Sequence, residues 1–165
     1  MSTFDIDLLS LKPDEFFNDL LRIVGSGLNA SRAYVFEYCE KTGTMSNTFE
    51  WSAANISCQR DKLQNIPVAV NPFWHEYMTQ NKIINFYDVK DIPSFPENLV
   101  LMEQDIKSIL VLPIHINNKY YGFWGVDECV SHRCWSKLEI AYMQAMTSFI
   151  RRFVAEREVR SSLDQ

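Results

Sequence analysis

The chain has 165 residues, of which 47% are hydrophobic and 13% aromatic, and this is enough apolar material for one compact domain with a single core. Its 16 basic and 21 acidic residues give a formal net charge of -5, and no run of Lys or Arg offers the positive surface that nucleic acid or an anionic membrane would bind. No apolar segment approaches the roughly 18 residues that span a bilayer, and acidic residues stand where a secretory leader would be basic. We therefore expect a cytoplasmic protein with neither nucleic acid nor membrane as a partner.

The first third of the chain predicts a helix followed by two strands. Pro13 suits the first turn of a helix, and apolar residues then recur at helical spacing as far as Leu28. Residues 32–39 and 48–56 are rich in β-branched and aromatic side chains, which favour strands. The polar segment between them contains Gly43, so we expect a hairpin.

The middle of the chain predicts two short helices separated by a strand. Asn71 and Pro72 suit the cap and first position of a helix that ends at Gln80. A strand is predicted over residues 82–89. A Ser-x-x-Glu spacing, typical of a capping box, then predicts a helix over residues 96–105.

The segment 108–129 contains two apolar runs joined by a pair of asparagines, Asn117 and Asn118. Asn tolerates the left-handed backbone of a two-residue turn, so the segment predicts a hairpin. The first run is apolar without alternation, as expected for a central strand covered on both faces. Pro113 cannot donate to a strand ladder and should mark an edge, a bulge or the last paired region of that strand.

A second Ser-x-x-Glu spacing, starting at Ser136, opens the final predicted helix. Its apolar stripe has a period near 3.5 residues, and we expect Ile150, Phe153 and Val154 to form a dimer and relay surface. Beyond that stripe, residues 155–165 are charged and have no stop signal, and we interpret them as the start of a connecting signalling helix.

Strands joined by hairpins, with helices before, between and after them, predict an α+β fold built on an antiparallel sheet. Four segments resemble, in their order and spacing, a GAF domain of bacterial signalling proteins: SRAYVFEY, FEW, IKSILVLPIHINNKYYGFWGVDEC and CWSKLEIAYMQAMTSFI. The likeness extends from Pro13 to Val154. It implies a single PAS-related domain over 1–165, with the terminal helices on one face of the sheet and a small-molecule pocket on the other. Such domains sense a ligand or dimerise in front of an effector such as a histidine kinase or a diguanylate cyclase, here expected beyond Gln165.

A signature for cyclic-nucleotide binding is spelled by letters within one tight turn and one strand: Asn118, Lys119, Phe123, Asp127 and Glu128. In phosphodiesterase GAF domains the Asn-Lys pair ends the last strand, and the phenylalanine and acids follow it. That arrangement is not reproduced here, so we interpret the match as coincidental.

The positions of the four cysteines bear on two chemistries that depend on a thiol. The resemblance places the chromophore cysteine of phytochromes near Asn98, and no cysteine lies between Cys58 and Cys129, so no covalent bilin is expected. The four cysteines do not fall where those of the free methionine sulfoxide reductase branch do. Cys129, His132 and Cys134 lie close together, but a closed metal site needs four ligands, and we predict no metal.

The resemblance directs the search for a ligand site to the sheet face opposite the terminal helices. Aromatic walls with a few polar groups suit a planar or heterocyclic ligand of unknown identity. The candidate ligand-binding residues are Trp51, Trp74, Tyr77, Phe86, Asp88, Phe95, Trp124 and Asp127.

Two functions remain open at this point. In the first, a small molecule changes the packing of the middle helices and so of the terminal helices. In the second, the domain is a ligand-free homodimerisation and relay module. Motifs for phosphate cradling, nucleophilic hydrolysis and metal hydrolysis are missing, so the domain itself is not expected to be an enzyme.

Overall fold

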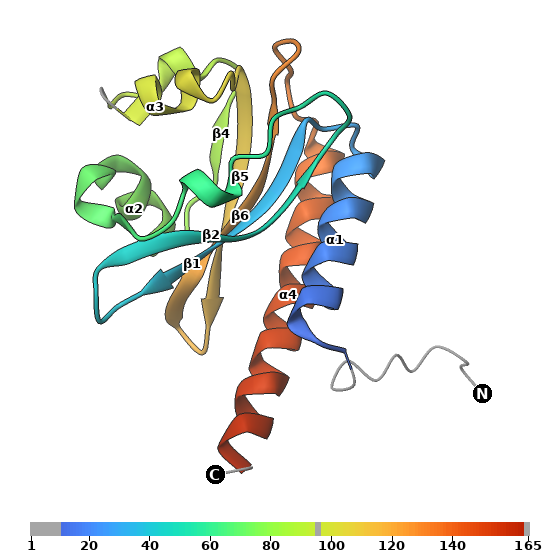
Figure 1. Cartoon of the computed structure of the whole chain (residues 1–165), viewed down its shortest axis with the longest axis vertical. Coiled ribbons are helices and arrows are strands. Elements are labelled where there is room, and N and C mark those ends of the chain that lie inside the picture. The colour runs from blue at the N-terminus through green and yellow to red at the C-terminus, as the bar shows by residue number, and fades with distance from the viewer. Residues whose placement is uncertain (1–10, 95–96, 164–165) are drawn as a thin grey trace.

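A six-stranded antiparallel sheet lies between two pairs of helices (Figure 1). The computed structural model describes residues 11–94 and 97–163. The strand order is β3-β2-β1-β6-β5-β4, so β1 and β6 are central. The strands are β1 (Arg32–Cys39), β2 (Thr44–Ser52), β3 (Ile66–Pro67), β4 (Ile84–Phe86), β5 (Ser108–Ile116) and β6 (Lys119–Glu128).

The two pairs of helices cover opposite faces of this sheet. The terminal helices α1 and α4 lie side by side on one face, and α2 and α3 stand over the other (Figure 1). The predicted α+β fold, with its terminal helices on one face, is therefore confirmed. The helices are α1 (Pro13–Gly27), α2 (Pro72–Thr79), α3 (Glu97–Glu103) and α4 (Lys137–Leu163), and short 3-10 turns are η2 (Arg60–Lys62), η3 (Val68–Val70) and η4 (Val89–Asp91).

Local sequence signals explain several element boundaries. Asn117 and Asn118 both have positive φ, 51° and 65°, which confirms the predicted turn between β5 and β6. Gly43 also has positive φ, so the first hairpin closes at once and β2 begins at Thr44, four residues before the predicted start. Pro113 lies past the end of the β4 pairing, which stops at Val111, so its missing N–H leaves no gap in that ladder.

The capping box that opens the last helix is present as predicted. The backbone N–H of Glu139 donates to Ser136 Oγ at 3.1 Å, and the backbone N–H of Ser136 donates to Glu139 Oε1 at 2.9 Å. This reciprocal pair satisfies two amide groups that the first turn of α4 would otherwise leave unpaired.

The face of the sheet that α1 and α4 cover is called the helical face below. The core on this face contains the three residues predicted to form a dimer surface. Ile150, Phe153 and Val154 are buried within one chain, and the ring of Phe153 stacks on Phe16 of α1 with centroids 3.9 Å apart. The prediction is therefore wrong for these side chains, because their apolar stripe packs on α1 and the sheet. A stripe of this period fits a monomer core as well as a helical partner.

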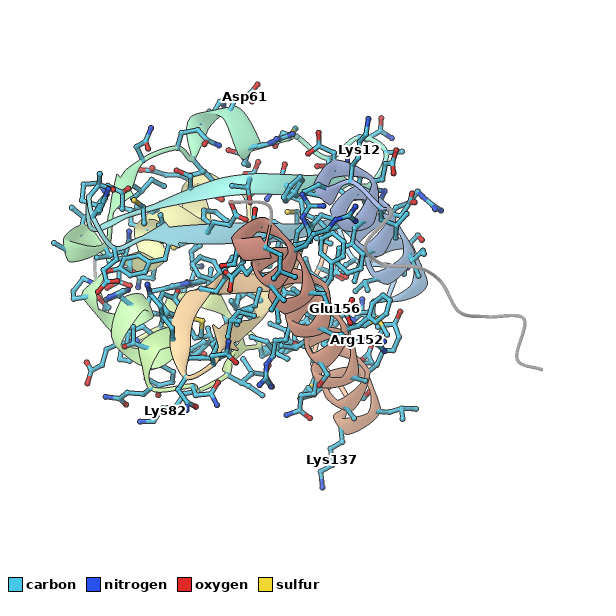
Figure 2. All side chains as sticks on the ribbon, turned by 90° about the horizontal axis from the view of Figure 1, so that it is seen from below. Lys12, Asp61, Lys82, Lys137, Arg152 and Glu156 are labelled. Carbon is cyan, nitrogen blue, oxygen red and sulfur yellow. The ribbon has the colours of Figure 1, made fainter. Side chains whose placement is uncertain are left out.

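Charged side chains lie on the outer surface of α4. Arg152 and Glu156 form an ion pair at 3.0 Å on the outside of the helix, where both are labelled in Figure 2. Arg157 Nη1 donates to the carbonyl of Leu11 at 3.1 Å. Residues 158–163 are exposed, and the end of α4 extends past the sheet (Figure 1).

Candidate ligand-binding site

A cavity of about 230 Å³ lies between the sheet and helices α2 and α3. Its walls are mostly apolar and come from both layers. The main apolar walls are Tyr34, Phe36, Ile109 and Phe123 from the sheet and Trp74 and Leu101 from the helices. The cavity lies on the sheet face where the family resemblance implied a pocket.

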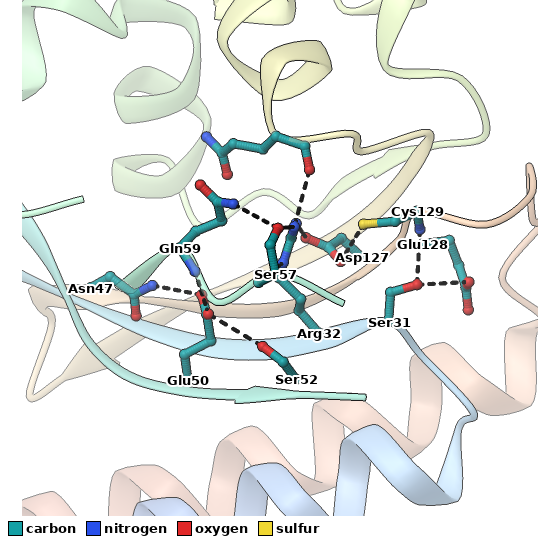
Figure 3. Close-up of polar contacts among 11 residues, drawn as sticks. Ser31, Arg32, Asn47, Glu50, Ser52, Ser57, Gln59, Asp127, Glu128 and Cys129 are labelled. Carbon is teal, nitrogen blue, oxygen red and sulfur yellow. Dashed lines mark hydrogen bonds and ion pairs between the residues drawn. The ribbon is translucent and has the colours of Figure 1, made fainter. Parts of the chain in front are cut away.

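A buried ion pair forms the polar end of the cavity. Arg32 of β1 and Asp127 of β6 lie opposite one another in the two central strands, with Nη1 and Oδ2 3.1 Å apart. Their exposed fractions are only 2% and 1%. Arg32 also donates from Nε to the carbonyl of Ser57 and from Nη2 to the Ser57 hydroxyl and the Gln104 carbonyl, at 2.8, 3.0 and 3.1 Å (Figure 3). The guanidinium therefore joins both central strands to the end of α3.

Burial controls the protonation of this pair. Loss of hydration raises the pKa of Asp127 to about 7, although the charge of Arg32 and its hydrogen bond act in the opposite direction. Burial is the largest single effect on Arg32 and by itself would lower its pKa. The charge and hydrogen bond of Asp127, together with Cys129 and Glu50, outweigh it and raise that pKa, so the guanidinium stays charged.

A second carboxyl group, Glu50 of β2, accepts hydrogen bonds from three groups. These donors are Asn47 Nδ2 at 2.9 Å, the backbone N–H of Gln59 at 2.7 Å and the Ser52 hydroxyl at 3.4 Å (Figure 3). All three bonds use the carboxyl oxygens of Glu50 as acceptors, so the chain already supplies donors to both of them.

A β-bulge places Asn47 beside the cavity. Val35 pairs with Phe49 but the next residue of β1 pairs with Asn47, so Thr48 is the extra residue in β2. Phe49 packs in the core beneath α1, whereas Asn47, two positions earlier, lines the cavity. Strict alternation would have put both on the same face.

The third carboxylate, Glu97, belongs to α3 but caps α2. It is 3% exposed, and it accepts the backbone N–H groups of Phe73 and Trp74 at 2.9 and 3.0 Å and the Ser94 hydroxyl at 2.9 Å. The Ser94–Glu97 spacing predicted a reciprocal capping box at the start of α3. The two side chains do bond to each other, but the Glu97 carboxyl group satisfies the first turn of α2 instead.

Three buried polar atoms of cavity-lining residues have no hydrogen-bond partner among the described residues. They are the hydroxyl of Tyr34, Oδ1 of Asn47 and Nε1 of Trp74. A buried polar group without a partner costs about 1–3 kcal/mol, so the cavity would be stabilised by a molecule that bonds to them.

The sequence located part of this site. Trp74 and Asp127 line the cavity as predicted. Tyr77 and Phe86 belong to the same apolar cluster but lie behind the cavity wall. Phe95 lies outside the described residues.

Asp88 lines a neighbouring groove of about 460 Å³, where its carboxylate is 3.5 Å from His132 Nε2. The prediction that it faces the cavity is wrong, because Asp88 caps the η4 turn by accepting from the Lys90 N–H at 3.0 Å.

The prediction that Trp51 and Trp124 line the cavity is wrong, because both side chains lie on the opposite sheet face, beneath α1 and α4. Trp51 packs over Gly25 of α1, and Trp124 donates from Nε1 to Thr147 of α4 at 2.8 Å. Alternation along β6 puts Phe123 in the cavity and its neighbour Trp124 on the opposite side.

Sequence reasoning missed the polar residues that distinguish this cavity: Arg32, Tyr34, Asn47, Glu50 and Glu97. The available signal was opposite charge in two predicted strands, Arg32 in the first and Asp127 in the last. This signal identifies an ion pair only when the strand order and register, which place the two residues opposite one another, are known.

Comparison with known proteins gives the family. The family model described as "GAF domain" matches residues 12–152. The chain belongs to the GAF domain family. A relative of this GAF domain is the methanogenesis regulatory histidine kinase FilI of Methanothrix harundinacea, which is 31% identical over 150 residues. The match covers 87% of this chain and 16% of FilI, so the chain spans only a small part of that relative's length.

Solved structures confirm the GAF fold. The cyanobacteriochrome TePixJ GAF domain has a TM-score of 0.76 at 18% identity, with 94% of this chain and 98% of that chain covered. A photoproduct-state GAF domain from Synechocystis sp. PCC6803 has a TM-score of 0.80 at 15% identity, with coverage of 91% and 98%. The phycocyanobilin-bound GAF domain of a cyanobacterial phytochrome has a TM-score of 0.79 at 17% identity, with coverage of 92% and 88%. These identities support the shared fold alone.

The cavity of this GAF domain does not fit a covalently attached bilin. A thioether would need a cysteine in the cavity wall, and Cys39, Cys58, Cys129 and Cys134 all lie elsewhere. The expectation that the chain carries no covalent bilin stays a prediction.

In the described part of the chain, no group of three or more His, Cys, Asp or Glu side chains is arranged to hold a metal ion. None of the helices described for residues 11–94 and 97–163 has the length and apolar character to cross a bilayer.

Proposed function

We propose that this GAF domain is a regulatory sensory module that binds a small molecule in the cavity beneath α2 and α3. The observation that supports this function is the cavity itself, and three of its lining residues have a buried polar atom without a partner among the described residues. The domain is non-catalytic, acts in the cytoplasm, and passes its signal to an effector such as a histidine kinase or a diguanylate cyclase beyond Gln165. The kinase relative FilI favours a kinase.

A chain of contacts leads from the cavity to α4. The Gln104 carbonyl at the end of α3 accepts from Arg32, and Arg32 pairs with Asp127 of β6. Trp124 lies three residues earlier in the same strand. Its side chain is on the other face of the sheet and donates to Thr147 of α4. A ligand that displaces α3 would therefore act on α4 through β6, across the sheet.

The alternative function is a ligand-free dimerisation and relay module. An apolar groove between α1 and α4 favours it, because Ile23 there is 52% exposed and Met146 and Phe149 lie beside it. A homodimer through this groove is compatible with both functions. Under the alternative, the cavity would stay unfilled in the cell.

Native mass spectrometry of the whole chain purified from cells tests the proposal, with a denatured sample as the control. We expect an added mass that disappears on denaturation. Bare chains, even after exposure to metabolite mixtures, would contradict ligand binding and favour the relay module. The same spectra report whether the chain is a monomer or a dimer.

A further inference from the structure

We infer that the cavity takes an uncharged molecule of one or two fused rings that carries a hydrogen-bond donor beside an acceptor, as a primary carboxamide does. This inference rests on the proposed function and names the class of ligand. Three features of the cavity support it: its size, the distribution of charge in its wall, and the identity of its unpaired polar atoms.

The size and shape of the cavity suit a small planar molecule. A dry cavity of about 150 Å³ binds benzene, so about 230 Å³ has room for one or two rings. Phe36 and Phe123 stack with ring centroids 4.7 Å apart, and Trp74 lies edge-on to Phe123 at 5.5 Å. Aromatic walls of this kind favour a flat ring system.

The charges in the cavity wall disfavour an anion. Among the described residues that line the cavity, the one basic side chain is Arg32, which already pairs with Asp127 and donates to Ser57 and Gln104. Two further carboxylates, Glu50 and Glu97, add negative charge. A buried anion here would meet repulsion without a free cation to offset its lost hydration.

The anion site that a helix start could supply is also occupied. The first free amides of α2, those of Phe73 and Trp74, already donate to Glu97. An incoming carboxylate or phosphate would have to displace this side chain from a position that is 3% exposed.

The unpaired atoms call for both a donor and an acceptor. Asn47 must direct its Nδ2 to the acceptor Glu50, so its unpaired Oδ1 needs a donor. The indole N–H of Trp74 can only donate and needs an acceptor, which a purely cationic group does not supply. The hydroxyl of Tyr34 can bond to either. A neutral amide offers both kinds of group, because its N–H groups donate and its carbonyl accepts.

Three probes of the same shape and different charge test the inference: naphthalene-2-carboxamide, naphthalene-2-carboxylate and the cationic naphthalene-2-carboxamidine. Isothermal titration of the whole chain should show the carboxamide binding at least about tenfold more tightly than either charged probe, a difference of about 1.4 kcal/mol. Trp74→Phe, which removes the indole donor, should weaken carboxamide binding about three- to tenfold.

A matched pair of variants on α3 tests whether the probe binds in this cavity. Leu101 lines the cavity, and Leu99 of the same helix does not. Leu101→Trp should fill the cavity and abolish carboxamide binding, whereas Leu99→Trp should retain it. Equal binding to both variants would overturn the assignment of the probe to this cavity.

The outcomes separate this inference from the proposed function. Tighter binding of the carboxylate or the amidine, lost in Leu101→Trp, would overturn the inference about charge and leave the sensory function standing. If no probe binds, the mass of the molecule that copurifies from cells decides: a neutral one supports the inference and a charged one overturns it. Failure of all probes together with bare chains in native spectra would overturn both.

Discussion

Exchanging either of two glycines of α1 for alanine tests the assignment of Trp51 to the helical face. Gly25 is buried against Trp51, and a Cβ atom added there would lie 2.2 Å from ring atom Cε3. Gly27 is two residues away in the same helix, and a Cβ atom there would meet nothing within 4 Å. The two substitutions are chemically identical and differ mainly in this contact.

The structure gives the expected difference in stability. Carbon atoms pack at about 3.5–4.0 Å, so the Trp51 ring would have to withdraw by more than about 1 Å, and overpacking of this kind costs about 1–3 kcal/mol. Both variants gain up to about 1 kcal/mol of helix propensity, with less at the helix end. We therefore expect Gly25→Ala to be less stable than Gly27→Ala by about 1–3 kcal/mol, or about 3–10 °C in Tm for a chain of this length.

Urea and thermal unfolding of both variants measure this difference, and a double-mutant cycle identifies its cause. In a Trp51→Leu background the cost of Gly25→Ala should largely vanish, because the smaller side chain vacates the contact. Equal stability of the two alanine variants, or a cost that persists without the indole ring, would refute the placement of Trp51 against α1.

Three other results are expected. Phe153→Ala should lower the free energy of unfolding by about 3–5 kcal/mol in urea titrations and leave the mass measured by light scattering unchanged, because Phe153 fills the core of one chain. The carboxyl carbon of Asp127 should titrate in NMR spectra near pH 7 rather than near 3.8. Between about pH 4 and 7 the native state holds a proton on Asp127 that the unfolded chain has lost. The contribution of this group to stability is therefore complete below about pH 4 and is lost as the pH rises through 7. Denaturant titrations at pH 5 and 8 would detect the difference. Glu97→Gln should speed hydrogen exchange of the Phe73 and Trp74 amides, because a neutral amide has one oxygen in place of the two that accept from them.

The order of elements in this chain could be predicted because its signals are local. Pro13 begins α1, the asparagine pair forms the β5–β6 turn, and Ser136 and Glu139 cap α4, each through contacts within four residues. Such contacts depend on spacing alone, which the sequence contains. The GAF family likeness added the sheet and the two layers of helices.

The polar cavity wall could not be predicted because it depends on register and on a bulge. Period-two alternation puts Phe123 and Trp124 on opposite faces but does not say which one faces the cavity. The extra residue Thr48 reverses the parity of β2, so Asn47 reaches the cavity although Phe49 does not. Glu97 caps a helix that begins 25 residues earlier in the chain, and no local spacing encodes that partner.

The attachments of α3 at its two ends have a mechanical consequence. Its first residue, Glu97, holds the start of α2, and the Gln104 carbonyl just after its last turn is held by Arg32 of the sheet. A segment of about 10 Å that is fixed at both ends resists sliding. It can swing only after one attachment breaks, and the other then acts as the hinge. Release of Glu97 would also uncap the start of α2, so the two helices that cover the cavity would lose their shared contact in the same step.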